Sequence, residues 1–106
     1  MVRSALLSVA AVTLVLASQA AFAEDVEKGR GFAKNLCSNC HDIGDGVART
    51  LPAGVPSFHW VSQNRSASEI EARMIRPSHP DMPEAPLTAA DRQHLLAYIG
   101  SLAKGN

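Results

Sequence analysis

The chain has few cysteines and aromatic residues, which usually stabilise a small protein, and no excess of charge that would indicate a class of partner. Its 106 residues contain two cysteines and five aromatic side chains (three Phe, one Trp and one Tyr), and 10 basic residues balance 10 acidic ones. Two cysteines are too few for the disulfide framework of a small secreted domain, and the length leaves room for one domain. Nucleic acids and anionic membranes are bound by basic surfaces, so the balanced charge indicates neither as a partner.

The N-terminal segment differs in composition from the rest of the chain. Residues 1–23 carry one charge, Arg3, followed by a mainly apolar run of 13 residues, 5–17, and by Ala-Phe-Ala at 21–23. A basic start, a short apolar stretch and a small-residue cleavage site are typical of a secretory signal peptide. A membrane anchor is the alternative, but a spanning helix needs roughly 20 apolar residues. We therefore expect a signal peptide at 1–23 and one exported, periplasmic domain at 24–106.

The remaining domain is small and has few large apolar side chains, so a cofactor or another covalent link is expected to stabilise it. Its two cysteines lie in Cys37-Ser38-Asn39-Cys40-His41, the C-x-x-C-H pattern of covalent haem attachment. Residues i and i+3 of a helix share one face, so both thiols can reach the two vinyl groups along one porphyrin edge. His41 follows directly and can bind the iron. The motif predicts one covalently bound haem c.

The two cysteines have other possible interpretations. A thioredoxin-like thiol pair needs a βαβ context, and the chain shows no strand-like alternation of apolar and polar residues. A zinc site built with two histidines lacks the second clustered pair of ligands that structural zinc sites have. An incidental pair of buried thiols is disfavoured because the chain has no other cysteine. A disulfide between positions three apart would also stabilise little.

The pattern of the chain predicts an all-α domain. Residues 24–41 place small and apolar side chains on one face and are expected to form a helix that carries both cysteines. Residues 42–58 contain glycines and prolines without a sustained period, which indicates a long loop. A loop of this length in a small domain usually encloses something, and the haem edge is the expected occupant.

The C-terminal half predicts two further helices and a stiff connection. Ser66 opens a capping-box sequence, and the helix that follows is expected to end at Pro77. Residues 77–86 hold four of the six prolines, so neither a helix nor a central strand is possible there. Thr88 opens a second capping box, and the last helix is expected to close at Lys104 and Gly105.

The sixth ligand of the iron separates an electron carrier from a gas-binding or catalytic haem protein. Met82 is the main candidate, because it lies on no helical face and its proline-rich surroundings would hold the sulfur at low entropic cost. Met74 is an alternative that shares a helical stripe with Ile70 and fits a core position better. His79 is a second alternative, and an open coordination site is a third.

At this point the chain resembles the class I c-type cytochromes over essentially its whole exported part. The resemblance depends on the order and spacing of Gly29, Cys37-Ser38-Asn39-Cys40-His41, Pro56-Ser57-Phe58, Met82-Pro83 and Leu95-x-x-Tyr98-Ile99. It implies a cytochrome c-like fold in which three or more helices surround the haem. It also implies that Gly29 lets the first and last helices cross closely, and that the Pro56 carbonyl accepts a hydrogen bond from Nδ1 of His41.

The same resemblance implies a function. We expect a single-electron carrier, not an enzyme, whose iron is held by His41 and Met82 and which makes transient contacts with larger redox proteins. Two alternatives stay open: a haem domain with an exchangeable sixth ligand for gas sensing or catalysis, and an electron-transfer subunit of a larger oxidoreductase.

The chain departs from the family pattern at one position of the first helix, and the sequence does not assign the residues that bind the haem propionates. The family often has an aromatic residue four positions before the first cysteine, where this chain has Ala33 next to Phe32. Either Phe32 turns in to fill that contact or the packing there is looser. Candidates for binding the haem propionates are Trp60, Arg49 and Arg65.

Overall fold

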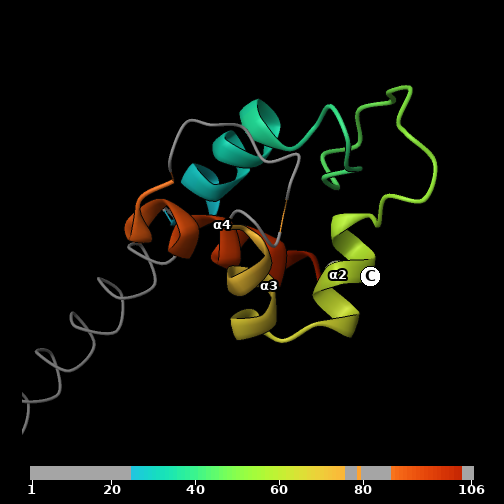
Figure 1. Cartoon of the computed structure of the whole chain (residues 1–106). Coiled ribbons are helices and arrows are strands. Elements are labelled where there is room, and N and C mark those ends of the chain that lie inside the picture. Colours follow the sequence, from blue (N-terminus) through green and yellow to red (C-terminus); the bar gives the residue numbers. More distant parts are fainter. Residues whose placement is uncertain (1–24, 76–78, 80–86, 104–106) are drawn as a thin grey trace, which may run out of the picture.

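The computed structural model describes residues 25–75, 79 and 87–103, and within these residues all regular secondary structure is helical. The helices comprise residues 25–36, α2 (Phe58–Asn64), α3 (Ala67–Arg73) and α4 (Ala89–Leu102), as Figure 1 shows. The predicted all-α class is confirmed. The predicted signal peptide at 1–23 and the predicted ligand Met82 lie outside the described residues.

The first helix is shorter than predicted. It ends at residue 36, and residues 37–40 form hydrogen-bonded turns. The Cys37 N–H donates to the Ala33 carbonyl at 2.9 Å, and the His41 N–H donates to the Cys37 carbonyl at 2.9 Å. These turns continue the path of the helix as far as His41.

The helix α2 was not predicted, and α3 is shorter than expected. At the start of α2 the Ser57 side chain accepts a hydrogen bond from the Trp60 N–H at 3.1 Å, which is an N-cap. The predicted capping box of α3 is present between Ser66 and Glu69. This helix ends at Arg73, several residues before Pro77.

The last helix begins as predicted. Thr88 and Asp91 form a capping box in which each side chain accepts a hydrogen bond from the other residue's backbone N–H, at 3.1 and 3.0 Å. Such a cap contributes typically about 1 kcal/mol to helix stability. Leu95, Tyr98 and Ile99 are the buried residues of α4, as their helical spacing predicts.

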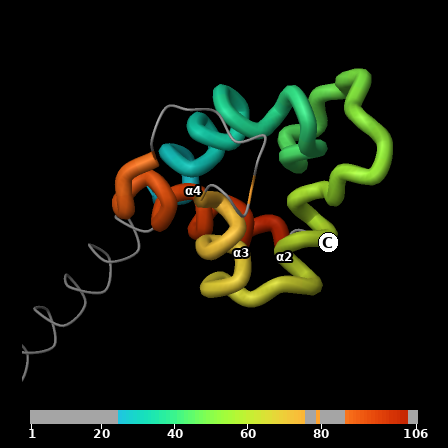
Figure 2. The backbone as a smooth tube through the Cα atoms, viewed as in Figure 1, coloured from blue at the N-terminus to red at the C-terminus, as the bar shows by residue number. Residues whose placement is uncertain are grey.

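The helix of residues 25–36 crosses α4, as Figures 1 and 2 show. The helices α2 and α3 also contact α4. Gly29 lies at the crossing, where an added Cβ atom would overlap the carbonyl group of His94 and lie 2.8 Å from Cβ of Tyr98. The close crossing implied by the resemblance is present. Phe32 fills the neighbouring contact, since its ring stacks on His94 with 6.5 Å between ring centroids.

One core joins the helices to the loop. Its buried residues come from the first helix, from the loop and from α2 and α4: Ala33, Ile43, Phe58, Leu95, Tyr98 and Ile99. The hydroxyl of Tyr98 donates to the Ile43 carbonyl at 2.6 Å, and the Phe58 N–H donates to the Asp42 carbonyl at 2.9 Å. Both ends of the loop are therefore anchored to the helical core, while its middle extends away from the helices (Figure 2).

None of the helices among the described residues has the length and apolar character that a membrane span requires.

Candidate functional site

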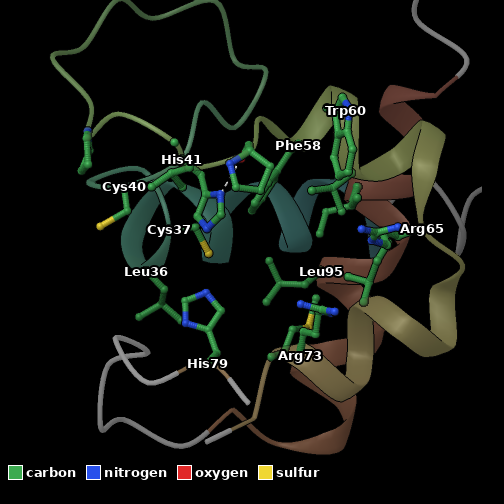
Figure 3. A pocket seen from close by; sticks show the side chains of 18 residues that line it. Leu36, Cys37, Cys40, His41, Phe58, Trp60, Arg65, Arg73, His79 and Leu95 are labelled. Atoms are coloured by element: carbon green, nitrogen blue, oxygen red, sulfur yellow. Dashed lines mark hydrogen bonds between the residues drawn. The ribbon is translucent and has the colours of Figure 1, made fainter. Parts of the chain in front are cut away.

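A cavity of about 490 Å³ lies between the first helix, the loop and the C-terminal helices, and Figure 3 shows the side chains that line it. Much of its wall is apolar. These apolar residues come from every helix and from the loop: Leu36, Val55, Phe58, Val61, Ile70, Leu95 and Ile99. Pockets for cofactors usually measure about 300 to 1,000 Å³ and are mainly apolar with a few placed polar groups. The cavity has both properties.

The C-x-x-C-H motif forms one wall of this cavity. Cys37, Cys40 and His41 all line it, and the turns after the first helix place them there. Cys37 is half-buried, whereas Cys40 is exposed. A group bound to both sulfurs would therefore have one edge near the surface and the rest of its body inside.

The imidazole of His41 is held in one orientation. Its Nδ1 lies 2.7 Å from the Pro56 carbonyl oxygen, and because a carbonyl can only accept, Nδ1 carries the hydrogen. In the neutral ring the lone pair is then on Nε2, which is free to bind a metal. The Phe58 ring packs against the imidazole with 5.2 Å between ring centroids. The contact that the resemblance implies for Pro56 is present.

Burial disfavours the thiolate form of Cys37. Burial, together with the nearby charge of Cys40, raises the pKa of Cys37 to about 11. Reactive cysteines of thiol–disulfide enzymes have a lowered pKa, because the thiolate is the nucleophile. The environment of Cys37 therefore argues against the thioredoxin-like alternative.

Among the described residues, no group of three or more His, Cys, Asp or Glu side chains could hold a metal ion.

The cavity also contains cations, and they differ in part from those predicted. Arg65 lines it and lies over the Trp60 ring, 5.2 Å from the ring centroid, as a cation–π pair. Arg73 lines it as well and was not predicted. Its signal in the sequence is its spacing from Ile70, since positions three apart on a helix share a face.

Arg49, another candidate for binding the propionates, is engaged elsewhere. It is absent from the cavity wall, and its guanidinium instead binds Asp45 through two hydrogen bonds of 2.9 and 2.7 Å. The planar guanidinium therefore binds both oxygens of one carboxylate in a bidentate pair. The Asp45 side chain is 5 % exposed, so this pair is a structural part of the loop.

Both alternative sixth ligands that the structure describes line the cavity. Met74 is the C-cap residue of α3 and packs against the core cluster. His79 lies across the cavity from His41 (Figure 3). Met82 lies outside the described residues, so its assignment stays a prediction.

The residues present fit a haem. Two thiols lie in the cavity wall, His41 beside them has its lone pair on Nε2, and much of the remaining wall is apolar. Arg65 and Arg73 offer guanidinium groups, which bind carboxylates in a planar, two-pronged geometry. The two propionates of a haem are carboxylates of this kind.

Comparison with known proteins agrees with the site. The family model "Cytochrome c" matches residues 26–103. Cytochrome c-552 from Bradyrhizobium diazoefficiens is 38 % identical over 96 residues, which cover 86 % of this chain and 91 % of that protein. No solved structure gives a significant match. The chain therefore belongs to the cytochrome c family of electron-transfer proteins, and its cofactor is a covalently bound haem c.

Proposed function

We propose that the protein is a periplasmic single-electron carrier whose haem iron is bound by His41 and Met82. The main support is the 2.7 Å contact between Nδ1 of His41 and the Pro56 carbonyl, because it leaves Nε2 as a fixed iron ligand beside the two attachment cysteines. Haem supplies the one-electron chemistry by changing between its ferrous and ferric states. The assignment of Met82 rests on the sequence alone, where Asp81-Met82-Pro83 lies on no helical face.

The chain's own residues affect both the reorganisation that accompanies electron transfer and the reduction potential of the haem. The Pro56 carbonyl and the Phe58 ring keep the His41 imidazole in place in both oxidation states, so little reorganisation accompanies the transfer. The apolar walls disfavour the extra positive charge of the ferric state, and a methionine ligand also raises the reduction potential. Both effects favour the reduced form.

The exposed position of Cys40 indicates where electrons leave and enter. The haem edge bound to this cysteine would lie close to the surface, within reach of a partner. We propose that the partners are larger redox proteins. Contacts between redox proteins are small, often below about 1,200 Å² in total, and therefore short-lived.

The ligation is tested by spectra of the purified holoprotein. Ferric haem with a methionine sulfur on iron has a weak near-infrared charge-transfer band, and we expect this band in the wild type. Met82→Ala should abolish it, while Met74→Ala serves as the matched control and should keep it. A wild-type protein that lacks the band and whose ferrous form readily binds carbon monoxide would instead have an exchangeable sixth site.

The export and attachment are tested in a bacterium that can attach haem outside the cytoplasm. The protein released by osmotic shock should begin at Glu24, which N-terminal sequencing would show. Its band on a denaturing gel should stain for haem, because only a covalent adduct survives denaturation. Replacing both Cys37 and Cys40 with alanine should remove the stain, and protein retained in the cytoplasm at full length would contradict the periplasmic assignment.

A further inference from the structure

His79 occupies a position in the cavity that the proposed carrier does not use. Its ring faces the ring of His41, with 6.1 Å between the ring centroids and 50° between the ring planes (Figure 3). The two histidines come from opposite sides of the cavity wall, one after the first helix and one after α3.

The spacing of the two rings suits a shared iron. An imidazole nitrogen binds a metal at about 2 Å, and the ring centre lies roughly 1 Å behind that nitrogen, so two imidazoles on opposite sides of one ion have centres about 6 Å apart. The observed 6.1 Å agrees with this value.

The His79 ring also has a nitrogen without a partner. Its Nδ1 is shielded from solvent and makes no hydrogen bond to any described residue, whereas Nδ1 of His41 is bound to Pro56. The Nδ1 atoms of His59 and His94 are likewise shielded and make no hydrogen bond, so what distinguishes His79 is its place in the cavity wall, where its ring faces that of His41. Arg65 and Arg73 also line the cavity, but they cannot bind the iron because guanidinium groups have no lone pair to donate.

We propose that His79 is a reserve axial ligand, whose imidazole binds the haem iron whenever the sulfur of Met82 is absent from it. The inference rests on the proposed ligation by Met82, which follows His79 by three residues in the sequence. Binding by His79 keeps the iron six-coordinate and low-spin, so small molecules such as carbon monoxide do not gain an open site. It also lowers the reduction potential, because methionine ligation is the arrangement that raises it.

The test compares four holoproteins by optical and electron paramagnetic resonance spectra and by carbon monoxide titration of the ferrous form. They are Met82→Ala, Met82→Ala with His79→Ala, Met82→Ala with His59→Ala, and His79→Ala alone. His59 is the matched control, because it is a histidine on α2 that does not line the cavity. Met82→Ala and the control should be low-spin, and the double variant without His79 should be high-spin. Carbon monoxide should bind Met82→Ala at least about tenfold more weakly than the double variant without His79, since the open form is then a small fraction.

The outcomes separate the two proposals. A Met82→Ala protein that is high-spin and binds carbon monoxide as tightly as the double variant without His79 would overturn the reserve role. A low-spin protein that stays low-spin without His79 would overturn it too, because another group must then bind. If His79→Ala alone converts the wild type to high-spin, His79 is the resident ligand and the proposed ligation by Met82 fails.

Discussion

Gly29 shows how one missing side chain sets the distance between two helices. A Cβ atom there would overlap the His94 carbonyl group, whereas a Cβ atom on Gly31, in the same helix, would meet no other atom within 4 Å. Backbone cannot yield as a flexible side chain can, so the first helix could accept alanine at 29 only by moving away from α4. That movement would loosen the packing of Ala33 and Tyr98, which are buried between these elements.

Gly29→Ala should therefore lower the free energy of unfolding of the holoprotein by about 1–3 kcal/mol, the usual cost of overpacking a core. Gly31→Ala is the control and should leave it unchanged or raise it by up to about 1 kcal/mol, because alanine is the better helix former. Urea unfolding followed by circular dichroism measures both. Equal stabilities for the two variants would show that the helices do not cross closely at Gly29.

Single residues were predictable where a short pattern carries their chemistry. Cys37, Cys40 and His41 follow from their spacing, and the Pro56 contact followed from the family resemblance. The pairing of Arg49, one of three candidates for the propionates, was not foreseen, because its partner Asp45 lies four positions earlier in a loop without regular structure. Spacing predicts such pairs on helices, but it does not predict them where the backbone conformation is irregular.

Among the elements, the two capping boxes marked the starts of α3 and α4 correctly, since both side chains of each box are visible in the sequence. The short helix α2 was missed because its only local signal is the N-cap Ser57, and its seven residues gain their stability from packing Phe58 into the core. Helices this short are unstable alone. Their existence depends on tertiary contacts that a sequence pattern does not contain.

The loop of residues 42–57 depends on the Asp45–Arg49 pair, and this dependence predicts how it responds to acid. The hydrogen bonds from Arg49 lower the pKa of Asp45 from its ordinary 3.8 to about 2, with a smaller contribution from the Val47 N–H. A carboxyl group whose pKa is lower in the folded state stabilises the fold above its unfolded pKa. The contribution is lost as the pH falls from about 4 towards 2.

Asp45→Asn should therefore be less stable than the wild type at neutral pH, and most of this difference should be lost as the pH falls from about 4 towards 2. Urea unfolding at a series of pH values measures it. Arg49→Gln provides the control background, in which the further change Asp45→Asn should lack most of this pH dependence. A pH-dependent difference of the same size in both backgrounds would mean that Arg49 is not its cause.

At the scale of the whole molecule, the haem was predictable from a motif of five residues and the all-α class from helical periodicity and capping boxes, but the shape of the haem cavity was not. Its wall joins residues from Leu36 to Ile99, and positions so far apart in sequence meet only through the fold. The cation Arg73 was missed for this reason. Its role becomes visible only when α3 is placed beside the cavity.

Arg65 and Arg73 matter for the whole molecule because they place positive charge around the cofactor of an otherwise nearly neutral chain. Ferric haem carries one more positive charge than ferrous haem, so nearby guanidinium groups favour reduction. Arg65→Gln and Arg73→Gln should each lower the reduction potential, by on the order of tens of millivolts for a charge partly screened by solvent. Arg30→Gln is the control, since Arg30 is exposed on the first helix and does not line the cavity. Potentiometric titration of the holoproteins measures all three, and an Arg73→Gln shift no larger than that of Arg30→Gln would remove Arg73 from the haem environment.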